Sequence, residues 1–124
     1  MNIETITEIA RNRGWDIAVS KQHDNSAVET TIYIDFIRSF GPPLGSITIT
    51  GELRGQDSCS LFVDIIDTFT KTTPDIIVSG WLDNNPAPEP DVYNEVYENA
   101  CEARASFWNI IRDLYLVIDD EAHP

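Results

Sequence analysis

Three successive segments in the first half of the chain alternate apolar and polar residues. Their apolar positions are Trp15, Ile17 and Val19, then Ile32, Ile34 and Phe36, then Ile47, Ile49 and Leu53. A period of two residues is typical of a strand with one buried and one solvated face. Turn-forming residues at 23–26 and 41–45 separate the segments. The pattern therefore predicts three antiparallel strands joined as a meander.

Helical spacing occurs on both sides of these strands. Ile3, Ile6, Ile9 and Ala10 recur every three to four residues, which predicts a helix over 3–13 that Asn2 caps and Gly14 ends. Residues 58–71 also place their apolar side chains on one helical face, although their β-branched content fits a strand as well. We interpret 58–71 as a helix because the helical spacing is nearly complete.

The last third of the chain begins with a short apolar run at 75–82, which we interpret as a fourth strand that follows Pro74. Three prolines then keep the loop at 83–90 extended. A long final helix is predicted from Asp91 to about Val117, and residues 119–124 are expected to be a frayed tail. Its apolar stripe is Val92, Val96, Ala100, Phe107, Ile111, Leu114 and Ile118.

These elements predict one α+β domain over residues 1–124, which is an ordinary length for a single domain. The order is helix, three strands, helix, strand, helix. A four-stranded, mainly antiparallel sheet with helices packed on one face would bury every apolar stripe. The three tryptophans, Trp15, Trp81 and Trp108, are expected in the core or at its edge.

The chain is strongly acidic, with 21 acidic and 8 basic residues and a net charge of −13. Such a chain repels nucleic-acid phosphates and anionic membrane surfaces, so we expect no direct binding to either. No apolar run is long enough to span a bilayer and no signal-peptide pattern is present, so we expect a cytoplasmic protein. Cys59 and Cys101 are then expected as core thiols without a disulfide. General salt adaptation is a secondary explanation of the acidity.

No catalytic, metal or cofactor motif is found. His23 lies in a turn cluster and His123 is next to last, and neither adjoins a nucleophile. The two cysteines are isolated, which argues against zinc. Residues 83–85 lack the central glycine of a calcium loop, and the glycines at 41 and 45 flank prolines rather than forming a phosphate loop. We therefore predict a protein that is not an enzyme and that uses no cofactor or metal.

Asp35 is the one carboxylate considered as a catalytic acid, because it lies between Ile34 and Phe36 in a predicted strand. A half-buried cleft there would shift its pKa. The competing interpretation, which we prefer, is an ordinary outward residue on the solvated face of the sheet.

The acidic residues are concentrated near the C-terminus. Residues 1–82 hold eleven acids and six bases, whereas residues 83–124 hold ten acids and two bases. Asp91, Glu95, Glu98 and Glu102 are spaced to share one stripe of the last helix, about 4.5–6 Å apart along its axis. Such a row roughly resembles a row of phosphates. Its competing interpretation is a plain solvated helix face.

The leading hypothesis is an acidic inhibitor that occupies a basic site of a nucleic-acid-acting protein, as DNA-mimic-like anti-CRISPR, anti-restriction and nuclease-immunity proteins of phages and mobile elements do. The analogy rests on size, charge and composition. The expected partner-binding residues are Asp91, Glu95, Glu98 and Glu102, with Tyr93 and Tyr97 beside them and Asp64 and Asp67 as a second cluster. The two tyrosines fit the core equally well.

Two other functions stay open. One is a non-catalytic structural module that forms a homodimer through its sheet edge or its long helix. The other is a small carboxylate enzyme with Asp35 as its acid.

Overall fold

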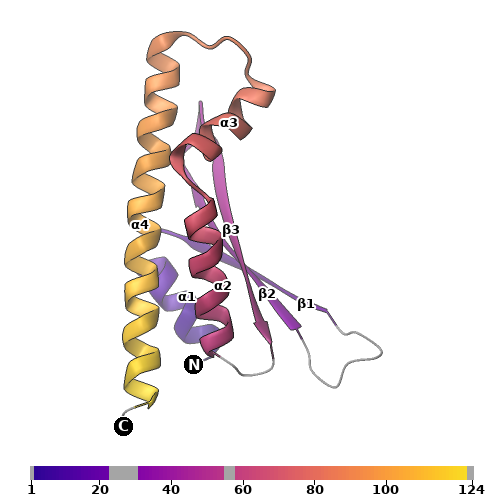
Figure 1. Cartoon of the computed structure of the whole chain (residues 1–124), viewed down its shortest axis with the longest axis vertical. Coiled ribbons are helices and arrows are strands. Elements are labelled where there is room, and N and C mark those ends of the chain that lie inside the picture. The colour runs from indigo at the N-terminus through magenta and orange to yellow at the C-terminus, as the bar shows by residue number, and fades with distance from the viewer. Residues whose placement is uncertain (1, 23–30, 55–57, 123–124) are drawn as a thin grey trace.

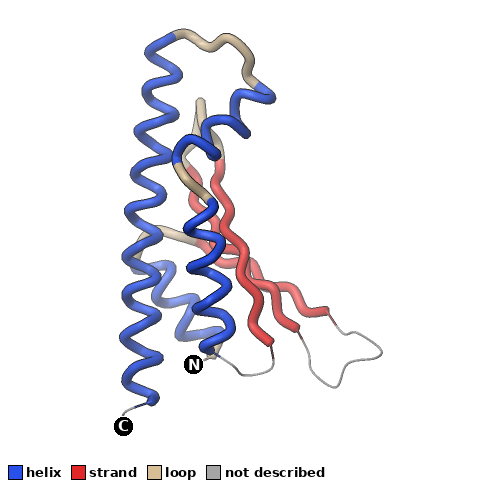
Figure 2. The backbone as a smooth tube through the Cα atoms, viewed as in Figure 1, coloured by secondary structure: helices blue, strands red, loops and turns tan. Residues whose placement is uncertain are grey.

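The computed structural model describes residues 2–22, 31–54 and 58–122. Three strands form one antiparallel sheet in the order β1-β2-β3, and helices cover one of its faces (Figures 1 and 2). The elements are α1 (Ile3–Asn12), β1 (Asp16–Gln22), β2 (Thr31–Ser39), β3 (Ser46–Arg54), α2 (Ser58–Lys71), α3 (Pro74–Asn84) and α4 (Pro90–Ala122). The predicted α+β class is confirmed, and the fourth strand is not found in the described part of the chain.

The N-terminal helix begins and ends where its sequence predicts. The side chain of Asn2 caps α1 by accepting a hydrogen bond from the backbone N–H of Thr5 at 2.9 Å. Gly14 follows the helix with φ +82°, a conformation that glycine adopts without strain. The chain then turns directly into β1.

The sheet has the register that the alternating pattern requires. Phe36 pairs with Ile17 of β1 on one side and with Ile49 of β3 on the other. These residues point to the same face of the sheet, and Phe36 and Ile49 are buried beneath the helices. The opposite face carries alternating polar residues such as Thr48 and Thr50. The three predicted strands are therefore confirmed.

The segment predicted as the fourth strand is the helix α3, so that prediction was wrong. Thr73 caps α3 by accepting a hydrogen bond from the N–H of Ile76 at 3.3 Å, and Pro74 occupies the first turn. Pro74 thus starts a helix, whereas we expected a strand to follow it. Val78 is buried against Val96 and Ala100 of α4. This packing outweighs the β propensity of the apolar run at 76–78.

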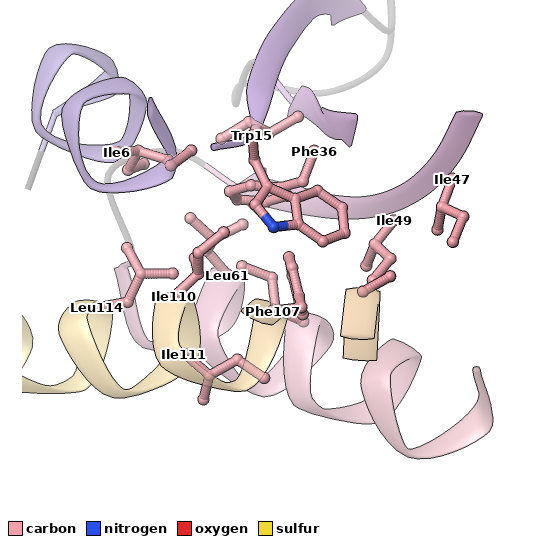
Figure 3. Packing of buried hydrophobic residues seen from close by; sticks show 14 of the residues in the cluster. Ile6, Trp15, Phe36, Ile47, Ile49, Leu61, Phe107, Ile110, Ile111 and Leu114 are labelled. Carbon is pink, nitrogen blue, oxygen red and sulfur yellow. The ribbon is translucent and has the colours of Figure 1, made fainter. Parts of the chain in front are cut away.

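The main core lies between the sheet and the helices α1, α2 and α4 (Figure 3). Phe107 of α4 is fully buried, with its ring centroid 5.2 Å from Trp15 and 5.3 Å from Phe36. The indole N–H of Trp15 donates to the hydroxyl of Ser106 at 2.9 Å, which satisfies its only polar atom. The predicted core position of Trp15 is confirmed.

The long helix α4 runs the length of the molecule along one side (Figure 1). It continues to Ala122, five residues beyond the predicted end, so the tail expected at 119–124 is helical as far as Ala122. Five of the seven residues of the predicted apolar stripe are buried: Val96, Ala100, Phe107, Ile111 and Leu114.

The outer edge of β3 is covered by side chains of α2. Asp64 accepts a hydrogen bond from the backbone N–H of Glu52 at 2.9 Å, and the Thr68 hydroxyl donates to the carbonyl of Thr50 at 3.4 Å. Backbone groups of alternate residues on an edge strand point away from the sheet and need partners. These two helix side chains supply them, which protects the edge from pairing with another chain.

Candidate protein-binding surfaces

The four acids of the predicted stripe are all exposed on α4. Asp91, Glu95, Glu98 and Glu102 lie in its first half. Because α4 is one continuous helix, spacings of three and four residues place their carboxylates along one side, as predicted.

The stripe belongs to a larger acidic region, which we call the acidic end. Residues 72–103 contain seven acids and no lysine or arginine, and all seven are exposed. They come from α3, from the loop after it and from the first half of α4, which together form one end of the elongated molecule (Figure 1). The seven are Asp75, Asp83, Glu89, Asp91, Glu95, Glu98 and Glu102.

One of the four acids of the stripe forms an ion pair within the described residues, and the other three do not. Glu102 accepts a hydrogen bond from Arg38 of β2 at 2.6 Å and so ties α4 to the sheet. Asp91, Glu95 and Glu98 have no basic partner within the described residues. Carboxylates at this spacing repel one another and lower the stability of the helix. These three acids, rather than all four, are the ones available to a cationic partner.

The two tyrosines lie on a different side of α4 from the acids. A residue two positions after Asp91 is turned by about 200° around the helix axis. Tyr97 packs against the helix α3. The ring of Tyr93 stacks on the ring of Tyr97, with the two ring centroids 6.5 Å apart. The negative charge of Asp75 on α3 is the main cause that raises the pKa of Tyr97. Tyr97 therefore helps to dock α3.

The second predicted cluster has partners within the chain. Asp64 covers the edge of β3 through the backbone of Glu52. Asp67 forms an ion pair with Lys71 one turn later on α2, at 2.9 Å. Both carboxylates are thus explained by local structure.

Sequence reasoning missed an aromatic surface between α2 and α4, which we call the aromatic groove. Phe62 and Phe69 of α2 contact Tyr115 and Trp108 of α4, with ring centroids 5.9 Å and 5.5 Å apart. A hollow of about 320 Å³ opens beside these contacts and a second of about 750 Å³ adjoins it, both lined by Trp108. Trp108 is 47% exposed, Tyr115 54% and Leu116 58%, so Trp108 does not lie inside the core, which was one of the two places expected for it.

Two arginines border the aromatic groove. The guanidinium of Arg104 lies over the ring of Phe69 at 4.3 Å, an attractive cation–π geometry. Its Nε atom is buried and has no hydrogen-bond partner within the described residues. Arg112 is exposed and likewise has no ion-pair partner there. The groove is thus apolar with a cationic rim, in contrast to the acidic end.

A signal for this groove was present in the sequence. Large apolar residues come directly after two members of the buried stripe of α4. Trp108 follows Phe107, and Tyr115 and Leu116 follow Leu114. A helix with apolar residues beyond one stripe has a second apolar face. We missed this face because tryptophan was assigned to the core by residue type.

Of the residues considered for catalysis, Asp35 is the one that the structure describes. His23 and His123 lie outside the described residues. Asp35 is on the open face of the sheet, where its carboxylate accepts a hydrogen bond from Thr50 at 2.7 Å. Within the described ranges no group of three metal-binding side chains is found.

Cys59 and Cys101 form no disulfide, and both are exposed, which corrects their predicted place in the core. None of the described helices combines the length and the apolar character that crossing a membrane requires. No family model, curated protein or solved structure matches the chain.

Proposed function

We propose that this chain is a non-catalytic, cytoplasmic inhibitor that uses its acidic end to occupy a basic site of another protein. The observation that carries the proposal is the segregation of charge. Seven exposed carboxylates lie at one end of the molecule, within 32 residues that contain no lysine or arginine. Such a surface attracts a cationic partner over long range and accelerates its binding.

A protein that binds or cleaves nucleic acid is the partner class that this surface fits best. Asp91, Glu95 and Glu98 present fixed negative charges about 4.5–6 Å apart along a rigid helix. A groove that binds a nucleic-acid strand is lined with lysine and arginine to meet closely spaced phosphates. The same groove can accept this row of carboxylates, and DNA or RNA is then excluded. By analogy of size, charge and composition alone, an anti-CRISPR, anti-restriction or nuclease-immunity protein is the class that we propose for this mode of action.

The test is a charge reversal with a matched control. The variant Asp91→Lys with Glu95→Lys reverses two acids one turn apart that begin in the first turn of α4. The control, Glu4→Lys with Glu8→Lys, makes the same change on α1, where Glu4 is also in the first turn. Both variants change the net charge by the same amount, and in both the substituted residues lie near a helix N-terminus. A difference in capture between the two variants therefore reports the position of the charges rather than their number.

Each protein is immobilised and exposed to a lysate of the native host at about 0.1 M and about 0.5 M salt. We expect the wild type and the α1 control to capture the same nucleic-acid-binding protein at low salt and to release it at high salt. We expect the α4 variant to capture none. Equal capture by the α4 variant would sink the proposal, as would capture that salt does not weaken.

The alternative function is a structural module that associates with itself. The aromatic groove favours it, because large exposed apolar surfaces are typical of interfaces. Trp108, Tyr115 and Leu116 of the groove follow the acidic end along α4.

A further inference from the structure

We propose that the aromatic groove is the interface of a homodimer, in which α4 of one protomer crosses α4 of its partner in antiparallel orientation, with the two-fold axis at Ala105. The inference goes beyond the proposed inhibitor, because it concerns the stretch of α4 from Glu98 to Leu116 and a second copy of this chain. It rests on exposure, on the order of charges along α4 and on the position of small residues.

The first observation is the amount of apolar surface left open. Trp108, Tyr115 and Leu116 are each about half exposed and lie together beside the hollow between α2 and α4. Scattered exposed apolar residues are normal, whereas a contiguous aromatic patch on a chain of net charge −13 indicates a surface that is covered in the functional state.

The second observation identifies the occupant. Glu98, Ala105 and Arg112 are each seven residues apart and all are exposed, so they share one side of α4. A two-fold axis at Ala105 brings Glu98 of one protomer opposite Arg112 of the other, and symmetry makes this pair twice. Neither side chain has a charged partner within the described part of its own chain. The outer side of α4 is therefore complementary to itself.

The third observation is that small side chains allow a close crossing at this point. Ala105 and Cys101 are exposed on α4, and Trp108 lies one turn after Ala105. Small residues at the crossing let two helices approach, and the two Trp108 side chains then fill the space on either side of the axis. Ala105 lies next to the midpoint of the helix, which runs from Pro90 to Ala122.

The antiparallel arrangement also limits the repulsion between two acidic chains. It sends the two acidic ends in opposite directions, because each lies on the N-terminal side of the crossing (Figure 1). The two Glu95 residues are then about 30 Å apart along the helix axis. This separation is several times the screening length of about 8 Å at 0.15 M salt.

The first test is the molar mass of the purified protein by sedimentation equilibrium, at about 0.15 M salt and about 100 µM protein, where a complex with a micromolar Kd is nearly fully formed. We expect the wild type to be a dimer. Glu98→Arg and Arg112→Glu should each weaken the dimer at least tenfold, because each places like charges together twice. The double variant with both changes should recover to within about threefold of the wild type.

Glu8→Arg on α1 is the matched control, and its dimer should be unaffected; circular dichroism checks that every variant is folded. A wild type that is monomeric overturns the proposal, as does a double variant that stays as weak as the single ones. Because no partner protein is present, the result is independent of whether the acidic end binds a basic protein.

The second test locates the axis. In a background with Cys59→Ser and Cys101→Ser, Ala105→Cys should form a disulfide with its counterpart under oxidised glutathione, since the two Cβ atoms meet at the axis. Asn94→Cys is exposed on the same side of α4, but its two copies would lie about 33 Å apart along the axis and should not cross-link. Cross-linking of Asn94→Cys but not of Ala105→Cys contradicts the proposed crossing.

Discussion

Gly51 is the residue at which the sheet and the helix α2 leave no room for a side chain. It is buried in β3, and a Cβ atom there would stand 2.9 Å from Cγ1 of Ile65 and 3.0 Å from Cδ1 of Leu61. The backbone of Gly51 does not have a positive φ, so an L-residue could adopt its conformation. Glycine is therefore required at this position for space rather than for backbone freedom.

We predict that Gly51→Ala lowers the free energy of unfolding by about 1 kcal/mol, because Ile65 must shift within a well-packed core. Urea unfolding followed by circular dichroism measures the change. The matched control is Gly80→Ala on the exposed side of α3, where nothing lies within 4 Å of the added atom. The control should gain up to about 1 kcal/mol from helix propensity. A stabilised Gly51→Ala protein would contradict the close packing of α2 on β3.

Among the elements, α3 shows what the sequence could and could not predict. The strands and α1, α2 and α4 have strong periodicity or clear caps, and all were predicted within a few residues, except for the C-terminal end of α4. The run Ile76-Ile77-Val78 favours a strand by propensity, and only its contact with Val96 and Ala100 selects the helix. That contact joins segments about twenty residues apart, so local patterns do not encode it.

The docking of α3 onto α4 can be tested through Tyr97. We predict that Asp75→Asn lowers the pKa of Tyr97 toward its ordinary value of about 10, because the negative charge of Asp75 is the main cause of the increase. NMR titration of the tyrosine rings measures it. Asp83→Asn removes the same charge farther along α3 and should leave the pKa of Tyr97 unchanged. Equal effects of the two substitutions would argue against the Asp75–Tyr97 contact.

The same contact has a consequence for stability at high pH. The pKa of Tyr97 is higher in the folded chain than in the unfolded one. As pH rises, the Tyr97 hydroxyl therefore loses its proton in the unfolded chain before it does so in the folded chain. The free energy of unfolding falls as pH rises above about 10, because deprotonation then favours the unfolded chain. Asp75→Asn should make the alkaline decline in stability less steep.

The candidate surfaces differ in how well a sequence can reveal them. The acidic stripe follows from spacing alone, since any helix aligns Asp91, Glu95 and Glu98. The aromatic groove depends on where α2 lies against α4, which decides that Phe107 is buried while Trp108 is half exposed. Phe107 and Trp108 are adjacent in the sequence, yet one is buried and the other is half exposed. The sequence alone does not predict this difference in burial, because it depends on the position of α2 in the fold.

At the scale of the whole molecule, the arginines and lysines with ion-pair partners lie away from the acidic end or at its border. Arg13 pairs with Asp113 at 2.9 Å and joins α1 to α4, and Arg38 pairs with Glu102 at 2.6 Å where the acidic end meets the sheet. Beyond this border the acids have no bases among the residues from 72 to 103. The chain therefore tolerates repulsion at one end, and the proposed binding of a cationic partner would account for this cost in stability.

This repulsion should be measurable. We predict that Glu95→Gln raises the free energy of unfolding by roughly 0.3 kcal/mol at low salt, because Glu95 lies one turn from both Asp91 and Glu98. Glu102→Gln is the matched control on the same stripe, and it should give no gain because it breaks the pair with Arg38. Urea unfolding at about 0.02 M and about 0.5 M salt measures both, since urea adds no charge. The gain of Glu95→Gln should disappear at high salt, where the wild type is already relieved of the repulsion. A gain that persists at high salt, or an equal gain in Glu102→Gln, would show that the acids of α4 do not form the uncompensated row that the proposed partner binding requires.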